Sequence, residues 1–364
     1  MKTFLKALLW IVVPVLCVAL GGVAGYYVSV RMTQTQNTDT VRREKFEQQT
    51  QAQVQQVTSG NTVSDIAKLC TKSVVNITIK EEKKGYTGGS TYSETVLGHG
   101  TGVIIRADGY IVTCHHVIEG ADIITVTTDD EQEYDAELIG FDEQFDLAVI
   151  RVDAKGLPAV KLGDSDAIAS GEEVVVIGNP LGEFGSSVSA GVLSTPAREL
   201  TIAGTPLRLM QTDAAVNPGN SGGAMLDMRG QLIGIVNAKI SASGIEGIAF
   251  AIPWNSIKDK VESIITNGSS GEKAVLGVST KDSSCYVDGG TVQCLEITSI
   301  REGSAAEQAG LQVGDYLLTV DNKKMQTNDD LTLVIKYHHA GDEVKFEIFR
   351  ENEKITITVT LGRA

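Results

Sequence analysis

A serine set among glycines is the first group in this chain that could carry chemistry. The segment 217–223 reads NPGNSGG, and Ser221 has glycines on both sides. Glycine lets the backbone turn sharply enough to expose a hydroxyl and to aim N–H groups at a neighbouring oxygen. Attack on a carbonyl carbon requires both a nucleophile and donors for the developing oxyanion. The same letters are also typical of a plain glycine-rich surface turn.

Two polar residues upstream favour the chemical interpretation. His116 lies in the segment TCHHV at 113–117, which ends an apolar run, and Asp146 opens the apolar run DLAVI at 146–150. A histidine can take the serine proton as general base, and an aspartate can hold that histidine in the correct tautomer. The chain order His, Asp, Ser is one in which such triads occur. The three residues therefore predict acyl transfer, with Ser221 as the nucleophile.

The segments around these residues read as short strands separated by turns. The runs are rich in β-branched residues, little helix lies between them, and Asp108-Gly109 is typical of a hairpin turn. This pattern predicts an all-β domain built as a sandwich or a pair of barrels. The expected strands are 73–79, 100–105, 110–113, 123–127, 136–140, 147–152, 173–177, 207–211, 232–237 and 248–252.

Six motifs, taken in order, resemble the HtrA (Deg) family of serine proteases. They are GTGVII at 100–105, GYIVTCHHV at 109–117, DLAV at 146–149, VVVIGNPLG at 174–182, NPGNSGG at 217–223 and GIAFAIP at 247–253. The resemblance covers about residues 61–364. It implies a mainly β fold: a chymotrypsin-like double β-barrel with the active site between the barrels, followed by an α+β PDZ domain. It also implies a homotrimer joined through the protease domains.

The resemblance assigns an oxyanion hole to the backbone N–H groups of Gly219, Asn220 and Ser221. It also leaves a choice of base. The two residues before the base are commonly asparagines in the family, whereas here they are Cys114 and His115. His115 is therefore a rival to His116, which the register of the motif favours.

The resemblance implies that the residue six positions before the nucleophile forms the floor of the S1 pocket. In this chain that residue is Ala215. An uncharged floor of the S1 pocket favours small or medium apolar side chains over Lys and Arg. Two stretches rich in Gly, Ser and Ala, 183–198 and 239–246, map onto the activation and specificity loops of the family.

The C-terminal part resembles a PDZ domain of the HtrA type. A helix is expected over 253–267, a short linker over 269–271, and a second helix from 328 to about 339. In such a domain, N–H groups of Leu276, Gly277 and Val278 would bind the carboxylate of a C-terminal peptide, which adds a strand to the neighbouring edge. The alternative is a small module that only packs against the protease.

The segment CYVDGGTVQC at 285–294 predicts a hairpin with Gly289-Gly290 as its turn. Counting outward places Cys285 opposite Cys294 on a non-hydrogen-bonded pair, with Cα atoms about 4.5 Å apart, which is within disulfide range. We expect this disulfide in an oxidising compartment, against the alternative of two unrelated thiols. A second bridge, between Cys70 and Cys114, is left open by the spacing.

The N-terminus carries 24 uncharged residues at 7–30, enough to cross a bilayer as one helix. Lys2 and Lys6 precede it and predict a cytoplasmic N-terminus with the catalytic domain outside. A cleaved signal peptide is the alternative, which the length of the run disfavours. The expected parts are 1–30 (cytoplasmic stub and transmembrane helix), 31–60 (polar linker), 61–268 (protease domain) and 269–364 (PDZ domain).

Charge and composition limit the classes of partner that this chain can have. The 364 residues include 31 Lys and Arg against 46 Asp and Glu, a net charge of −15, which argues against a nucleic-acid partner. No cofactor and no metal site are expected. We expect a membrane-anchored, extracytoplasmic serine endopeptidase that cleaves misfolded or regulatory envelope proteins in quality control and stress response, regulated by its PDZ domain. The alternative is a proteolytically silent peptide sensor or holdase.

Overall fold

The protein is described from a computed structural model. The predicted membrane span 7–30, the linker 31–60 and the loop 239–246 lie outside the described residues. Among the residues that are described, no helix is long and apolar enough to cross a membrane. The described residues are 61–85, 91–179, 185–202, 204–238 and 247–363.

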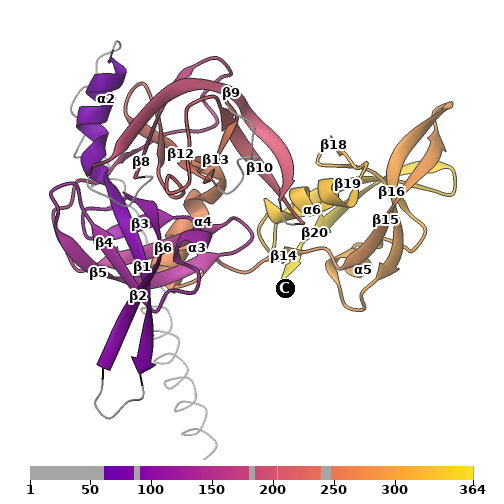
Figure 1. Ribbon diagram of the computed structural model, residues 1–364. Coiled ribbons are helices and arrows are strands. Elements are labelled where there is room, and N and C mark those ends of the chain that lie inside the picture. Colours follow the sequence, from indigo (N-terminus) through magenta and orange to yellow (C-terminus); the bar gives the residue numbers. More distant parts are fainter. Residues whose placement is uncertain (1–60, 86–90, 180–184, 203, 239–246, 364) are drawn as a thin grey trace, which may run out of the picture. The chain divides into compact units, whose positions relative to one another are not determined.

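Six antiparallel strands close into a first barrel in the order β1-β2-β3-β6-β5-β4 (Figure 1). Ile77, Val112 and Ile150 on three of these strands are fully buried in one apolar core. All six strands were predicted, although β2 and β5 begin earlier than expected. The strands are β1 (Val74–Gly85), β2 (Thr91–Ile104), β3 (Tyr110–Thr113), β4 (Ile123–Thr127), β5 (Glu133–Asp142) and β6 (Leu147–Val152).

A second sheet has seven strands in the order β11-β8-β9-β10-β13-β12-β7. Pairing of β11 with β12 closes the first six of these into a ring, and β7 lies parallel to β12 beside it. The predicted pair of barrels is therefore confirmed. The strands are β7 (Lys161–Leu162), β8 (Glu173–Gly178), β9 (Ser187–Ile202), β10 (Thr205–Thr212), β11 (Ala224–Asp227), β12 (Gln231–Val236) and β13 (Ala249–Pro253).

Strand β9 corrects one expectation. The resemblance implies one of the family's activation and specificity loops at 183–198, whereas residues 187–202 form a strand that pairs with both β8 and β10. Pairing on both edges outweighs the weak β-propensity of Gly, Ser and Ala, because propensity in sheets depends on neighbours. Strand β11 was not predicted either, since its four residues are too few for an alternating pattern.

Helices flank the barrels. The helix α2 (Val63–Cys70) begins with a capping box between Thr62 and Asp65, and a short 3-10 turn, η1 (Thr71–Ser73), follows it. The helix α3 (His115–Ile118) is a single turn directly after β3. The helix α4 (Trp254–Asn267) buries one apolar face, as its predicted pattern required, and ends at Gly268 with a left-handed φ of 76°.

The C-terminal domain has its own apolar core, which includes Leu317, Phe346 and Ile348. The helix expected to reach residue 339 ends at Lys336. A sheet in the order β15-β16-β17-β19-β20 carries the domain, with β18 paired to β17 and a separate ladder between β14 and β21. The elements are β14 (Ala274–Val275), β15 (Val278–Val287), β16 (Gly290–Ile300), α5 (Ala305–Gln308), β17 (Tyr316–Val320), β18 (Lys323–Lys324), α6 (Asn328–Lys336), β19 (Glu343–Arg350), β20 (Glu353–Thr360) and β21 (Gly362–Arg363).

The β15–β16 hairpin turns one residue earlier than predicted. Val287 pairs with Gly290, so the turn is Asp288-Gly289, and φ values of 53° and 82° at these two residues suit a type I′ turn. Cys285 therefore faces Val292, and Cys294 faces Ser283. The predicted direct opposition of the two cysteines is wrong. They are diagonal neighbours, and both are buried thiols in this structure.

Candidate active site

His116 and Asp146 meet at one end of the first barrel. His116 is in the single turn α3, and Asp146 precedes β6 with a left-handed φ of 51°. The ring nitrogen Nδ1 of His116 lies 2.6 Å from Asp146 Oδ2, and the His116 backbone N–H donates to Oδ1 at 2.9 Å. The Asn237 side-chain amide donates to Oδ2 at 2.7 Å. The carboxylate is thus held by three N–H groups.

These contacts set the charge state of Asp146. Burial acts to raise the pKa of the carboxyl, but the hydrogen bonds and charge of His116, with the Asn237 amide, hold it below its ordinary value. The carboxylate is therefore ionised at neutral pH and can stabilise a protonated His116. The rival, His115, stacks on Phe141 with ring centroids 4.5 Å apart. The structure thus brings His116, and not His115, to the carboxylate.

The serine lies on a tight turn. Asn220 N–H donates to Asn217 O at 3.0 Å, and Gly219 has a φ of 92°, which fits a type II turn with proline second and glycine third. Thr101 of the first barrel binds this turn at two carbonyls, that of Gly219 and that of Ser221. Its Oγ1 donates to Gly219 O at 2.7 Å, and its N–H donates to Ser221 O at 2.9 Å.

The glycine after the serine is required by space as well as by conformation. Gly222 has a φ of 84°, and a Cβ there would lie 2.0 Å from Thr101 O and 2.3 Å from Thr113 Oγ1. The backbone of the second barrel therefore approaches the first closely enough to exclude any side chain. This close approach explains why a glycine stands at this position.

The three predicted oxyanion donors differ in whether their N–H groups are already hydrogen-bonded within the turn. Asn220 N–H is used within it, whereas the N–H groups of Gly219 and Ser221 donate to no acceptor among the described residues. The Ser221 hydroxyl accepts a hydrogen bond from Ala238 N at 3.1 Å. Within the described part of the chain, no hydrogen bond joins Ser221 to His116.

The remaining predicted site residues lie in two places. Ala215 is exposed, and its carbonyl accepts from Ser189 Oγ of β9 at 2.7 Å. Leu276 and Gly277 in the C-terminal domain use their carbonyls to accept from Ala306 N and Arg301 N. They border a pocket of about 710 Å³ that both domains line: Leu276, Val278, Ile300, Leu331 and Ile335 come from the C-terminal domain, and Asp142, Gln144, Pro206 and Lys260 come from the protease domain.

Sequence reasoning missed Thr101 and Asn237. Thr101 lies inside the GTG motif at 100–102, but the motif alone does not indicate that its hydroxyl and N–H bind the serine turn. Asn237 directly follows β12, and its position at the end of the expected strand 232–237 does not indicate a partner on the other barrel. Both residues act across the two barrels, so only the folded chain reveals their partners.

Comparison with known proteins agrees with this architecture. The family described as the trypsin-like peptidase domain matches residues 100–235, and the PDZ domain family matches residues 274–361. The solved structure of the HtrA-type protease AlgW with a decapeptide has a TM-score of 0.68 at 31% identity, covering 83% of this chain and 99% of that one. The fold is therefore that of a two-barrel peptidase joined to a PDZ domain.

Sequence relatives narrow this class. The Bacillus subtilis protein named serine protease Do-like HtrB is 32% identical over 366 residues, covering 94% of this chain and 79% of that protein. A Chlamydia muridarum protein, named a probable periplasmic serine endoprotease DegP-like, is 39% identical over 72% of this chain and 53% of that protein, so this chain spans about half its length. The chain belongs to the HtrA-type serine proteases, a family of peptide hydrolases.

Proposed function

We propose that this chain is a serine endopeptidase with Ser221 as nucleophile, His116 as general base and Asp146 as the residue that orients the base. The observation that carries the proposal is the 2.6 Å contact between His116 Nδ1 and Asp146 Oδ2. With Nδ1–H donating to the carboxylate, the neutral imidazole has its Nε2 lone pair available to accept a proton. Thr101 ties the serine turn to the barrel that carries this pair.

The proposed reaction proceeds through an acyl-enzyme. Rotation of Ser221 toward His116 lets Nε2 take the hydroxyl proton as Oγ attacks the scissile carbonyl. Backbone N–H groups of Gly219 and Ser221 stabilise the oxyanion. His116 then returns the proton to the leaving amine, and water hydrolyses the ester by the same route. These steps use only groups of the chain and water.

Casein digestion tests this proposal. Ser221→Ala and His116→Ala should each lower the rate by several powers of ten, because triad deletions do so elsewhere. His115→Ala is the matched control and should keep most of the activity. An inactive His115→Ala variant beside an active His116→Ala variant would reverse the assignment of the base.

A second candidate is a proteolytically silent peptide sensor or holdase. The observation in its favour is the hydrogen bond from Ala238 N to Ser221 Oγ, which turns the hydroxyl to a partner other than the base. The casein assay separates the two, since a silent protein leaves casein intact in wild type and Ser221→Ala alike. We favour the peptidase, because a catalytic hydrogen bond is often absent before substrate binds.

The PDZ domain would take C-terminal peptides. The loop of Leu276, Gly277 and Val278 borders the 710 Å³ pocket, which suits a terminal carboxylate at the backbone N–H groups and an apolar last side chain. Two similar solved structures are described as the HtrA-type protease AlgW, one with a decapeptide and one with a tripeptide. At the protease site, the uncharged Ala215 supports a preference for small or medium apolar residues.

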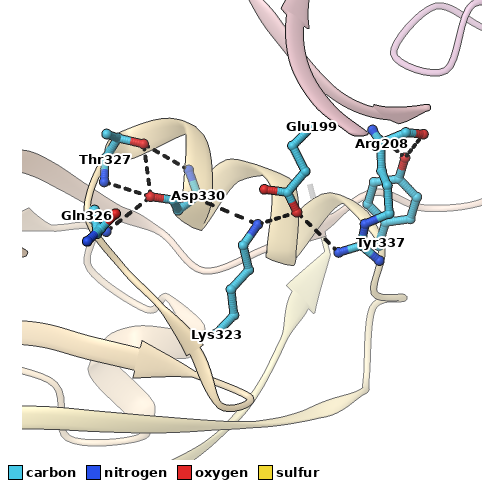
Figure 2. A network of polar contacts seen from close by, with 7 residues as sticks. All are labelled: Glu199, Arg208, Lys323, Gln326, Thr327, Asp330 and Tyr337. Atoms are coloured by element: carbon cyan, nitrogen blue, oxygen red, sulfur yellow. Dashed lines mark hydrogen bonds and ion pairs between the residues drawn. The ribbon is translucent and has the colours of Figure 1, made fainter. Parts of the chain in front are cut away.

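Regulation of the protease by the PDZ domain is supported by polar contacts between the two domains (Figure 2). Lys323 of β18 donates to the Glu199 carboxylate of β9 at 2.7 Å, and Arg208 of β10 lies 3.5 Å from the same oxygen. The Tyr337 hydroxyl accepts from Arg208 N at 3.0 Å. Strands β9 and β10 belong to the barrel that carries Ser221, so a peptide that moves α6 can act on that barrel.

We further propose an envelope location, which the DegP-like relatives with "periplasmic" in their names support. Residues 7–30 would anchor the protein, with domains at 61–268 and 269–364 outside the cytoplasm and three copies joined through the protease domains. Substrates would be misfolded or regulatory envelope proteins. A reporter fused after Gly60 should be active only outside the cytoplasm, and activity in the cytoplasm would contradict the anchor.

A further inference from the structure

Behind the proposed base lies a thiol. Cys114 directly precedes α3, and its side chain is fully buried. Its Sγ, a ring nitrogen of His116 and a carboxylate oxygen of Asp146 all lie within 4.8 Å of one another. A thiolate, an imidazole and a carboxylate are the three ligand types that zinc takes in proteins.

We propose that Cys114, His116 and Asp146 form an inhibitory site for Zn²⁺ and for thiophilic divalent cations of the same class. This inference rests on the proposed function, because the cation would act by occupying the catalytic base. Around tetrahedral zinc, bond lengths of about 2.0–2.3 Å place ligand atoms about 3.5 Å apart. The cluster reaches that geometry only if the 2.6 Å contact between His116 and Asp146 opens, because these two ligand atoms must move apart to admit the cation.

The charges in the site balance. A thiolate and a carboxylate supply two negative charges, which neutralise a divalent cation without leaving a net charge in a buried space. On binding, the S–H bond of Cys114 breaks and its proton leaves to solvent. The proton on His116 Nδ1 moves to Nε2 through solvent as Nδ1 binds the cation. Nε2 then carries a hydrogen and cannot accept the proton of Ser221.

The surrounding groups hold the ligands in place. The Cys114 thiol donates to Val236 O at 3.4 Å, and this hydrogen bond is given up when the cation replaces its proton. The carboxylate of Asp146 accepts from the backbone N–H of His116 and from the amide of Asn237, and both of these bonds remain. Such outer contacts orient ligands in metal sites. The Asn237 amide oxygen is itself buried and accepts no hydrogen bond from the described residues. The exposed fractions of the His116 and Asp146 side chains are 17% and 18%, so a cation can reach them from solvent.

The first experiment measures binding without activity. Ser221→Ala protein that also carries Cys285→Ser and Cys294→Ser, so that the contacting thiol pair of the hairpin cannot bind the cation, is titrated with Cd²⁺ in a phosphine reductant, and the ultraviolet thiolate-to-cadmium band is recorded. We expect one Cd²⁺ per chain with a band that disappears when Cys114→Ser is added to Ser221→Ala. A matched control is Cys70→Ser in the same background, because Cys70 is also buried with its Sγ 3.5 Å from a carbonyl, that of Gly230. A band lost with Cys70→Ser and retained with Cys114→Ser would overturn the site.

The second experiment measures inhibition. Zn²⁺ should inhibit peptide hydrolysis by the wild-type chain, and a chelator should reverse the inhibition. With each rate normalised to the metal-free rate of the same variant, Cys114→Ser should raise the Zn²⁺ concentration needed for half-inhibition at least tenfold. Equal inhibition of wild type and Cys114→Ser would overturn the proposal. A chain that binds Cd²⁺ through Cys114 but never cleaves casein would refute the peptidase while leaving the metal site intact.

Discussion

Asp146 combines an unusual backbone conformation with a fully engaged carboxylate. Its φ of 51° lies in the left-handed region, which aspartate tolerates better than most residues, and three N–H groups converge on its oxygens. Backbone strain of this kind is common where a side chain must be aimed. The backbone therefore fixes the carboxylate before substrate arrives, and His116 takes its orientation from it.

Thr101 gives the first prediction at the scale of single residues. Thr101→Val keeps the shape but removes the hydroxyl that donates to Gly219 O and accepts from Asn179 N at 2.8 Å. Because Gly219 O and Asn179 N–H lose their hydrogen-bond partner, the free energy of unfolding should fall by about 1–3 kcal/mol. We also expect kcat to fall, because the Gly219 N–H loses its fixed direction, while KM changes little.

Thr101→Ser is the control, since it keeps the hydroxyl. Denaturant unfolding and steady-state kinetics measure the two effects separately. If Thr101→Val lowers stability but leaves kcat untouched, Thr101 supports the fold and does not position the oxyanion donors.

The limits of sequence reasoning are clear at this scale. Ser221, His116 and Asp146 could be chosen from the sequence because each lies in a local motif of a recognisable type. Thr101 and Asn237 could not, because their contacts join positions 118 and 91 residues apart. No periodicity or spacing encodes a hydrogen bond across two barrels.

At the scale of elements, local sequence patterns predicted the strands that have alternating apolar residues. They did not predict strands that form only because neighbouring strands pair with them. The strands of the first barrel are β-branched and were all expected. The strand β9, rich in small and polar residues, forms because β8 and β10 bind both its edges. The hairpin at 285–294 was expected, but its register depended on which dipeptide took the turn.

The hairpin leads to a prediction about its cysteines. Cys285 and Cys294 are diagonal neighbours whose thiols contact each other, and the pKa of Cys294 is raised to about 12, first by burial and then by Cys285. Diagonal Cα atoms lie about 7–8 Å apart, beyond the usual disulfide range. A bridge between them therefore requires the backbone of the hairpin to move. We expect it to form in an oxidising compartment, where disulfides are favoured, and to be reduced readily because the hairpin opposes it.

A register variant tests this. Ser283→Cys with Cys285→Ser places a cysteine directly opposite Cys294. Its bridge should resist a thiol reductant that opens the wild-type bridge, as followed by peptide mapping. Thiols at both wild-type positions in protein from its native compartment would contradict the predicted disulfide.

At the scale of the whole molecule, one lysine joins the PDZ domain to the loop before Asp146. Lys336 at the end of α6 donates to Gln144 O and to Pro206 O, and its Nζ lies 4.5 Å from the centre of the Phe145 ring. Burial lowers the pKa of Lys336 to about 8. Between pH 8 and the ordinary value of 10.5, the unfolded chain therefore binds more protons at this residue than the folded chain.

The sign of the resulting pH effect follows directly. The contribution of Lys336 to folding stability should rise as pH increases from about 8 to 10. Lys336→Met should remove this rise, and the difference between the two unfolding curves isolates it from other titrating groups. Parallel pH profiles for wild type and Lys336→Met would show that the lysine is solvated and the contact open in solution.

The division of the proposed triad between two barrels determines when, during synthesis, the catalytic site can be assembled. His116 and Asp146 are translated early, but the turn of Ser221 is held by a barrel whose last strand ends at Pro253. A chain emerging from the ribosome therefore carries a base and a nucleophile that no fixed geometry connects. If the proposed triad is correct, proteolytic activity should therefore arise only after both barrels have closed, and a growing chain should not cleave itself.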